Sequence, residues 1–510
     1  MFSCIKTCSL VGLNGYIIDV ETDVSRGMPG FNIVGLADMA IKEAKERART
    51  AVKNSGFEFP LAKITTNLSP ANLKKDGTQM DLALALGILA SSSQLNIDKS
   101  SEFLFIGELS LDGAINKVDG ALPMVISCRE NGFKKFVVPF ENRDECAVVQ
   151  DIEIYPVKNL NEVVDFINGD LNIARHVVES YFDESNIKND YDFEDMRGQE
   201  QLKRALEISA AGSHNLLMLG SPGSGKTMAA KRIPSILPRL TFEEAIEVTK
   251  IYSVSGLLKN TGLITKRPFR SPHHTASTAS LIGGGKIPKP GEVSLAHNGV
   301  LFLDELPEFQ KNVIEALRQP MEDGVVNISR VSATLKYPSD FIFVCSLNPC
   351  PCGFYGDPNH DCTCTPNEIN RYLGKISNPI LDRIDIHIEV KPVKFEELSS
   401  STKAESSAAI AERVERARQL QLERFNGQKI YANSQIPDKL LSKYIILDKK
   451  LKDIMQLAFK KYKFSGRAYS KILKLSRTIA DLAGSDEILE EHLLEAIRYR
   501  VMDTNYWGNK

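Results

Sequence analysis

The sequence lacks any apolar run long enough to cross a membrane. A transmembrane helix needs about 18 or more consecutive apolar residues, and no stretch of the 510-residue chain approaches that length. The first residues also lack the layout of a secretory signal peptide, which starts with basic residues and continues with an apolar core. We therefore expect a cytoplasmic protein with no membrane partner.

A strong excess of charge of either sign is also absent. Lys and Arg together number 63 and Asp and Glu 65, so the formal net charge is −2. Such a chain is not a polycation that would coat nucleic acid with its whole surface. Any contact with DNA must therefore use local patches of basic residues. The length predicts roughly three domains of about 150 residues, each able to bury its own core.

The front of the chain has the pattern of one α+β domain, at residues 1–171. Its apolar periodicity predicts an amphipathic helix at 38–56, a helix at 81–90 that is apolar nearly all round, and a hairpin within 103–118. Residues 172–192 are polar and have no sustained period, so they predict a linker.

A glycine-rich loop between an expected strand at 216–219 and an expected helix at 228–233 is the strongest motif of the chain. It matches G-x-x-x-x-G-K-[ST]. In such a loop the backbone N–H groups turn toward phosphates, the lysine reaches the terminal phosphates, and the last hydroxyl ligates Mg²⁺. The sequence therefore predicts a site for ATP and Mg²⁺ made by Gly220, Ser221, Pro222, Gly223, Ser224, Gly225, Lys226 and Thr227.

Two later apolar stretches end in polar groups that suit ATP hydrolysis. The strand expected at 300–303 leads into Asp304 and Glu305, and the strand expected at 341–347 leads into Asn348. We expect Asp304 to hold Mg²⁺ together with Thr227, and Glu305 to orient and deprotonate the attacking water. The amide of Asn348 would help to position that water.

Two places could supply local basic patches for DNA. Alternating strands at 324–330 and 333–337 suggest a hairpin, and Arg330 and Lys336 are its DNA-binding candidates. The stretch 460–477 contains seven basic residues and no acidic one. A stripe facing DNA and the solvated surface of a helical bundle explain this stretch about equally well.

Four of the nine cysteines crowd into fifteen residues as two C-x-C pairs: Cys350, Cys352, Cys362 and Cys364. In a reducing compartment they favour metal binding or plain thiols over disulfides. Four thiolates can close a tetrahedral Zn²⁺ site, although the spacing is tighter than the usual C-x₂₋₄-C and His360 could replace one ligand. The alternative is that the first pair packs behind the strand end and the second pair lies at the surface.

The motifs follow one another in an order similar to that of the magnesium-chelatase-like AAA+ ATPases. With the Asn-Pro-Cys-Pro-Cys-Gly run at 348–353 and the Leu-Asp-Arg motif that ends at Arg383, the chain resembles the ComM (YifB) family. The resemblance implies that Arg383 reaches the nucleotide of a neighbouring subunit, where a guanidinium neutralises charge on the transferring phosphate. It also implies the sensor 2 position for Arg467. The alternative for Arg383 is an ordinary surface salt bridge.

The front domain resembles the Lon-protease-like domain of ribosomal-S5-like fold. The resemblance rests on Val-Gly-Leu-Ala-Asp at 34–38, Asn-Leu-Ser-Pro-Ala at 67–71 and Ile-Gly-Glu-Leu-Ser-Leu-Asp-Gly at 106–113. In active Lon proteases the nucleophilic serine occupies the position of Gln79, and the segment that supplies their lysine base has no lysine here at 118–133. A serine is a weak nucleophile without its base, so a domain that lacks both is expected to be non-proteolytic.

The resemblance implies an α/β multidomain protein: an α+β S5-like domain at 1–171, a linker, an AAA+ P-loop core at 193–395 and an α-helical lid at 396–510. It also implies a homo-oligomer, a hexameric ring that translocates on DNA and, in the ComM family, branch migration during natural transformation. Three other functions stay open: a chelatase-type or protein-remodelling ATPase without DNA translocation, an ATP-fuelled protease, and a nucleotide-gated scaffold without turnover.

Overall fold

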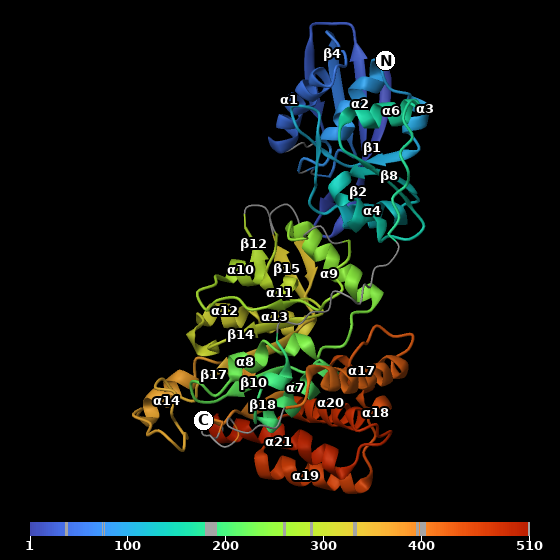
Figure 1. Ribbon diagram of the computed structural model, residues 1–510. Coiled ribbons are helices and arrows are strands. Elements are labelled where there is room, and N and C mark those ends of the chain that lie inside the picture. The colour runs from blue at the N-terminus through green and yellow to red at the C-terminus, as the bar shows by residue number, and fades with distance from the viewer. Residues whose placement is uncertain are drawn as a thin grey trace. The chain divides into compact units, whose positions relative to one another are not determined.

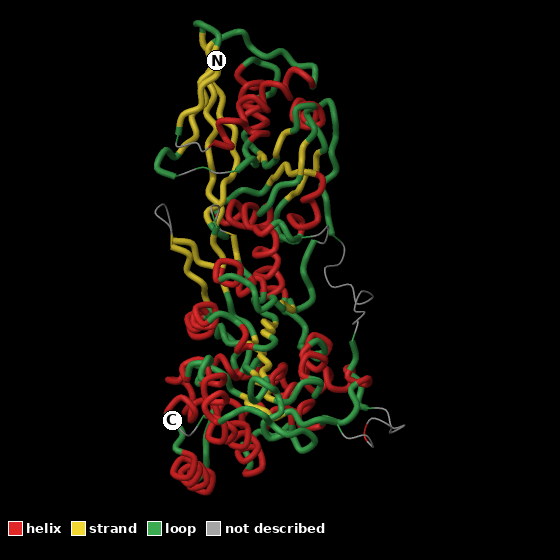
Figure 2. Tube along the Cα trace, turned by 90° about the vertical axis from the view of Figure 1, so that its left-hand side faces the viewer, coloured by secondary structure: helices red, strands yellow, loops and turns green. Residues whose placement is uncertain are grey.

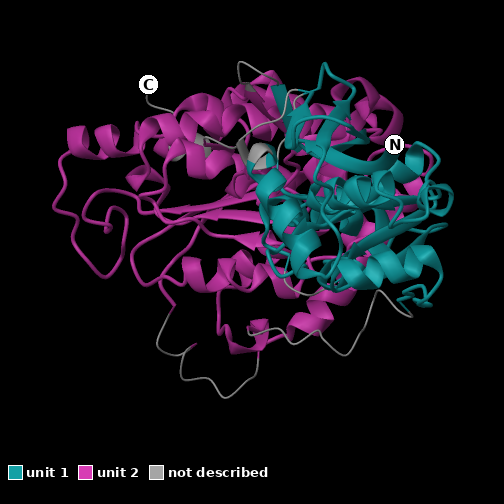
Figure 3. Ribbon diagram, turned by 90° about the horizontal axis from the view of Figure 1, so that it is seen from above, with its two compact units in different colours: residues 1–183, 242–265, 329–337 teal, residues 184–241, 266–328, 338–510 magenta. Residues whose placement is uncertain are grey.

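A computed structural model of the protein describes residues 1–35, 39–73, 75, 77–178, 191–258, 262–285, 289–329, 334–393, 397 and 404–507. The chain forms two compact units, coloured separately in Figure 3. Unit 1 comprises residues 1–183, 242–265 and 329–337, and unit 2 comprises 184–241, 266–328 and 338–510. Over the described ranges, none of the helices has the length and apolar character that a membrane span requires.

Unit 1 is built on a seven-stranded sheet with the strand order β3-β4-β2-β1-β5-β8-β9. The long strands β1 and β2 pair antiparallel, and β2 pairs antiparallel with β4. Strands are yellow in Figure 2. On the other side of β1, the strands β5, β8 and β9 extend the sheet in parallel. The strands are β1 (Phe2–Val11), β2 (Asn14–Ser25), β3 (Gly30–Val34), β4 (Lys63–Ser69), β5 (Phe103–Phe105), β8 (Lys135–Pro139) and β9 (Glu153–Val157).

The two helices predicted for the front of the chain are confirmed. α1 (Met39–Asn54) buries its apolar face, and α2 (Asp81–Ser91) is buried at every residue because it packs against β1, β2 and α1. The predicted hairpin is confirmed in its inner part only: β6 (Glu108–Leu109) pairs antiparallel with β7 (Ile115–Asn116), whereas β5 joins the large sheet. The buried face of α1 is formed by Ile41, Ala44, Ala48, Ala51 and Val52. The remaining helices of the front stretch are α3 (Ile97–Ser100), α4 (Ala121–Glu130), α5 (Arg143–Ala147) and α6 (Leu160–Asn168).

Unit 1 also takes in two stretches from later in the chain. α9 (Phe242–Ser255) packs against α4, and its Ser253 hydroxyl donates a hydrogen bond of 2.7 Å to the buried carboxylate of Glu145. Lys117 donates to the Leu258 carbonyl at 2.8 Å. In the second stretch, the Leu335 side chain of β16 (Thr334–Pro338) lies against Gly12. Unit 1 is therefore a product of three separate segments.

The core of unit 2 is a five-stranded sheet with the strand order β11-β14-β17-β10-β18, and every neighbouring pair is parallel. Its central strands read as apolar runs because both faces of a parallel sheet are covered by helices. This architecture confirms the predicted α/β class. The strands are β10 (Leu216–Leu219), β11 (Phe269–Arg270), β14 (Val300–Leu303), β17 (Ile342–Leu347) and β18 (Ile386–Glu389).

Two predicted helices of this unit differ from the observed ones. The helix after the phosphate loop is α8 (Lys226–Ala230), which starts and ends earlier than predicted. It ends at Ala230, whose carbonyl would accept a helical hydrogen bond from position 234, where Pro234 has no N–H to donate. The helix predicted at 310–319 is divided into α12 (Lys311–Ala316) and α13 (Arg318–Asp323). Shorter elements complete the stretch: α10 (Thr278–Ile282), β12 (Gly283–Gly284), β13 (Lys289–Pro290), α11 (Glu292–Leu295), β15 (Val325–Ser329), α14 (Pro366–Leu373) and α15 (Asn378–Leu381).

The last hundred residues are helical, as predicted, and gather at the red end of the chain in Figure 1. α17 and α20 pack against α7 (Glu200–Gly212), and α21 packs against β18. Their apolar side chains continue the core of the parallel sheet in one hydrophobic cluster. The helices are α17 (Ser407–Arg424), α18 (Leu441–Tyr444), α19 (Lys449–Tyr462), α20 (Gly466–Leu482) and α21 (Glu490–Tyr506).

Candidate nucleotide-binding site

The predicted catalytic groups lie at the carboxyl edge of the parallel sheet. The phosphate loop follows β10, Asp304 and Glu305 follow β14, and Asn348 follows β17. After β10 the chain runs to the far edge of the sheet at β11 and returns strand by strand, whereas β18 lies on the other side of β10. Ligands of open α/β sheets bind at such a reversal of strand order, outside the carboxyl ends of the strands.

The backbone of the phosphate loop requires its glycines. Gly223 and Gly225 have φ values of +77° and +92°, in the left-handed region that favours glycine. A Cβ at Gly220 would collide with the Val390 carbonyl oxygen after β18. Ordinary side chains at these positions would strain the loop, so the spacing of the motif follows from its geometry.

Lys226 folds back over the loop. Its ammonium donates hydrogen bonds to the Gly220 and Ser221 carbonyls at 2.7 and 2.9 Å and to Asn348 Oδ1 at 3.3 Å. The residue is only 8% exposed, and this burial lowers its pKa to about 8, although the nearby carboxylates of Asp304 and Glu305 act in the opposite direction. Phosphate oxygens can replace these neutral acceptors, so the Lys226 ammonium is already positioned to bind the phosphates of a nucleotide.

The two predicted Mg²⁺ ligands are already in contact. Thr227 Oγ1 donates a hydrogen bond of 2.7 Å to one carboxylate oxygen of Asp304. The Ser346 hydroxyl donates to the other oxygen, and the Glu305 N–H donates to Ser346 Oγ at 3.3 Å. A hydroxyl and a carboxylate are hard oxygen ligands that suit Mg²⁺, which would neutralise charge on the phosphates when bound.

Glu305 is exposed and is held in an unusual backbone conformation, with φ of +53°. Non-glycine residues rarely adopt this region, and such strain persists where the surrounding structure imposes it. The Tyr372 hydroxyl of α14 also belongs to this site, because it accepts a hydrogen bond from the backbone N–H of Asn348. Sequence reasoning missed Ser346 and Tyr372. The only signal for Ser346 was a hydroxyl within an otherwise apolar strand.

The shifted pKa of Lys226 predicts that nucleotide affinity depends on pH. Below pH 8 the ammonium is already charged, whereas above it the empty site must take up a proton to bind phosphate, so affinity should fall by up to about tenfold per pH unit. Titration calorimetry at pH 9 in two buffers of different ionisation enthalpy should report uptake of about one proton. An affinity that is flat from pH 7 to 9.5 would contradict the shift.

The same shift affects the stability of the nucleotide-free protein. The folded chain binds this proton less tightly than the unfolded chain, whose lysine has the usual pKa of 10.5. Burial of the ammonium therefore lowers the free energy of unfolding at all pH values below about 8, and stability recovers as the pH rises from 8 toward 10.5.

Arg383 and Arg467 lie together at the opposite, amino edge of the sheet. Asn215, which directly precedes β10, donates to the Arg383 carbonyl at 2.9 Å. Four-residue strands separate the two edges by about 13 Å. Both arginines line a cavity of about 510 Å³ in unit 2. Neither therefore reaches the phosphate loop of its own chain.

Glu322, at the end of α13, holds both arginines. It forms a close ion pair with the guanidinium of Arg383 and lies 3.9 Å from that of Arg467. The Nε atom of Arg383 is buried and has no hydrogen-bond partner among the residues that the structure describes. Arg383 thus takes part in a salt bridge while its own side chain is only 12% exposed, and its role at a neighbouring nucleotide stays a prediction.

The two basic regions predicted as DNA candidates, the stretch 460–477 and the hairpin, differ in whether their described basic side chains form ion pairs within the chain. In α20, Lys471 pairs with the buried Asp385, and Arg477 pairs with Asp481 at 3.0 Å, so much of the basic stretch at 460–477 supports the fold. Lys336 is exposed on β16. Arg330 lies outside the described residues, so its role stays a prediction.

The four clustered cysteines converge, with their Sγ atoms all within 4.8 Å of one another. His360 is not part of the group. Its ring stacks on Phe354, with ring centroids 4.7 Å apart, and its Nδ1 lies 3.5 Å from Asp357.

In unit 1, Gln79, which stands where active Lon proteases have their nucleophile, is 8% exposed.

Comparison with known proteins identifies the family. The chain is 42% identical over 499 residues to Competence protein ComM of Haemophilus influenzae, covering 96% of each chain. It belongs to the ComM/YifB family of magnesium-chelatase-like AAA+ ATPases. It is also 41% identical to Uncharacterized protein YifB of Escherichia coli, over 98% of this chain and 97% of that one.

Three family models cover most of this ComM/YifB chain. The model for magnesium chelatase subunit ChlI matches residues 192–398, one for subunit ChlI of Mg-chelatase matches 20–142, and one for the ChlI C-terminal part matches 404–500. The Magnesium-chelatase 38 kDa subunit of Cereibacter sphaeroides is 23% identical over 180 residues, which are 32% of this chain and 54% of that subunit. The groups at the carboxyl edge of the sheet thus belong to an ATPase family.

Proposed function

We propose that this ComM/YifB protein is an ATP-driven motor that acts on DNA, with branch migration during recombination of incoming DNA as its role. The observation that carries the proposal is the extent of its similarity to Competence protein ComM, which covers 96% of the chain and so includes unit 1 as well as the ATPase core. The notion of a DNA substrate follows from that family resemblance.

We further propose a ring of identical subunits, hexameric by family resemblance. The position of Arg383 supports this arrangement, because it lies at the sheet edge opposite its own phosphate loop. An interface in which the amino edge of one subunit meets the carboxyl edge of the next is heterologous, and such interfaces form rings when the rotation between subunits closes. ATP with Mg²⁺ held by Thr227 and Asp304 would then lie between subunits.

A chelatase-type or protein-remodelling ATPase is the second candidate. The names of the matching family models favour it. The similarity to the 38 kDa chelatase subunit, however, covers only 32% of this chain. Proteolysis by unit 1 is disfavoured because Gln79 replaces the nucleophile and no lysine occurs at 118–133.

The deciding experiment measures ATP hydrolysis in the presence of different candidate substrates. Single-stranded DNA, forked duplex, four-way junctions, a porphyrin with Mg²⁺ and casein are each added to the purified chain, with a Lys226→Ala chain as the control for contaminating ATPases. Stimulation by DNA alone is expected. Stimulation by porphyrin or casein but not by DNA would favour the second candidate.

The basic candidates Lys336 and Arg330 give a sharper prediction. Reversal of the charge at Lys336 or Arg330 should weaken DNA binding and DNA-stimulated hydrolysis while the basal rate stays unchanged. Each lost phosphate contact should reduce the dependence of log affinity on log salt by about one unit. Lys53→Glu, which reverses an exposed lysine on α1, is the matched control. Unchanged DNA affinity in both hairpin variants would remove this region as a DNA contact.

A further inference from the structure

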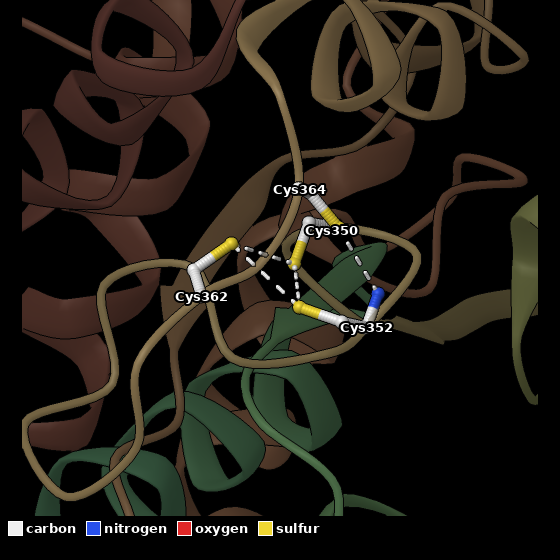
Figure 4. A group of neighbouring side chains, drawn as sticks. All are labelled: Cys350, Cys352, Cys362 and Cys364. Carbon is white, nitrogen blue, oxygen red and sulfur yellow. Dashed lines mark hydrogen bonds between the residues drawn. The ribbon is translucent and has the colours of Figure 1, made fainter.

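The loop of residues 350–364, here called the cysteine loop, brings its four thiol groups to one point (Figure 4). The Sγ atom of Cys350 lies 3.3 Å from that of Cys352 and 3.7 Å from that of Cys362, and the Cys352 and Cys362 sulfurs are 3.6 Å apart. Four sulfurs at about 2.3 Å from a tetrahedral Zn²⁺ would lie about 3.8 Å from one another. The sulfurs of Cys350, Cys352 and Cys362 therefore already have nearly the spacing of a zinc site, and that of Cys364 lies within 4.8 Å of each. A disulfide would need about 2.05 Å.

Backbone N–H groups of the cysteine loop donate hydrogen bonds to two of the sulfurs. The Tyr355 N–H donates to Cys350 Sγ at 3.3 Å, and the Cys352 N–H donates to Cys364 Sγ at 3.4 Å. Donors of this kind stabilise thiolates and fix the direction of metal ligands. A set of four sulfur ligands favours zinc or iron over hard cations such as Mg²⁺.

The cysteine loop touches the phosphate loop at two points. Gly353 has φ of +89°, and a Cβ there would come within 2.6 Å of Pro222 Cδ. The Asp357 carboxylate accepts a hydrogen bond from the Ser221 hydroxyl. Two residues of the ATP site therefore pack directly on the cysteine loop.

The cysteine loop also connects the end of β17 to the start of α14. Cys350 follows Asn348 by two residues. Cys364 directly precedes Thr365, the N-cap of α14, where Thr365 and Glu368 form a capping box. α14 in turn carries Tyr372, which accepts the hydrogen bond from the Asn348 N–H. An ion bound by all four sulfurs would therefore tie the segment after Asn348 to the start of the helix that supports it.

We propose that the four cysteines bind one Zn²⁺ and that this ion holds the cysteine loop against the phosphate loop, so that zinc binding increases nucleotide affinity. The proposal deepens the function of the ATP site and rests on that site binding nucleotide. Coupling is reciprocal, so bound nucleotide should also slow the loss of zinc.

The first test measures metal content and nucleotide affinity in the full chain. Protein purified without added metal should contain about one zinc per chain, and Cys362→Ser should lose it, whereas Cys4→Ser, which changes another half-buried thiol, should keep it. Removal of zinc from the unsubstituted chain with a zinc-selective chelator, in excess Mg²⁺, should weaken ADP binding by roughly 5- to 150-fold, the usual range for coupled sites. Restored zinc should restore affinity.

The second test separates the metal from the contact. Gly353→Ala should keep zinc but weaken ADP binding, because the new Cβ pushes against Pro222. Gly356→Ala is the matched control, since its φ of +79° imposes similar strain while its Cβ would meet only the Tyr506 hydroxyl at 3.9 Å.

Four outcomes would overturn the proposal in part or whole. Absence of metal, or iron in place of zinc, overturns the zinc site. Equal ADP affinity with and without zinc, or equal effects of the two glycine substitutions, overturns the coupling. A zinc-loaded chain that binds no ADP would instead contradict the ATP site, so the two failures are distinguishable.

Discussion

A Glu305→Gln chain should bind ATP as tightly as the unsubstituted chain and hydrolyse it roughly 10²- to 10⁴-fold more slowly, the loss expected when a general base is removed. The physical reason is that the Glu305 side chain is exposed and follows directly after the Mg²⁺ ligand Asp304, where it can reach the attacking water. The neutral amide keeps the size of the side chain but cannot take a proton from water.

The measurement compares the dissociation constant of ATP with the turnover rate. Lys226→Ala is the companion variant, and it should lose ATP binding itself because its ammonium is the cation placed at the centre of the loop. ATP hydrolysis by Glu305→Gln at the unsubstituted rate would show that another group activates the water, and the assignment of Asp304 and Glu305 would then be wrong.

An Arg383→Ala chain should lose roughly 10³- to 10⁵-fold in turnover if its guanidinium completes the nucleotide site of a neighbour, the range measured for such arginines. The role must be exercised in trans, because Arg383 lies at the far edge of the sheet from its own phosphate loop and is held there by Glu322. Arg383→Lys keeps the charge but loses the planar fork that binds phosphate oxygens in pairs, so it should restore little.

A mixing experiment tests the direction of this contact. Arg383→Ala subunits keep an intact phosphate loop and Lys226→Ala subunits keep an intact Arg383, so each pure protein should be inactive. In a random equal mixture, about a quarter of the heterologous seams join an intact loop to an intact arginine, and hydrolysis should return. A mixture no more active than the two variants assayed separately would show that Arg383 acts within its own chain or not at all.

The sequence predicts the carboxyl edge of the sheet well, for a physical reason. Parallel strands end at one edge, so the polar residues after 300–303 and 342–347 had to meet the loop after Leu219. Ser346 was missed because a hydroxyl inside an apolar strand has many possible partners. Its contact with Asp304 depends on the register of β14 and β17, which local patterns do not encode.

Local sequence patterns could not predict contacts between residues that are far apart in the sequence. Glu322 and Arg383 are 61 positions apart, and no local sequence pattern around either residue predicts that the two side chains form an ion pair. The periodicity of α9 shows that one face is buried but not which surface covers it, and that surface proved to be α4, more than a hundred residues earlier. The early end of α8 could have been foreseen from Pro234.

The assembly of unit 1 from three segments limits what gene truncation can reveal about it. The backbone passes between the units at 183–184, 241–242, 265–266, 328–329 and 337–338. A chain started at residue 172 still carries α9, whose buried Ala245, Val248 and Ile251 would lose α4 and face water. Newly exposed apolar surface favours aggregation. Defects of such a deletion variant would therefore reflect the damage to the remaining segments of unit 1. The contribution of the front residues has to be measured with substitutions that leave all three segments in place.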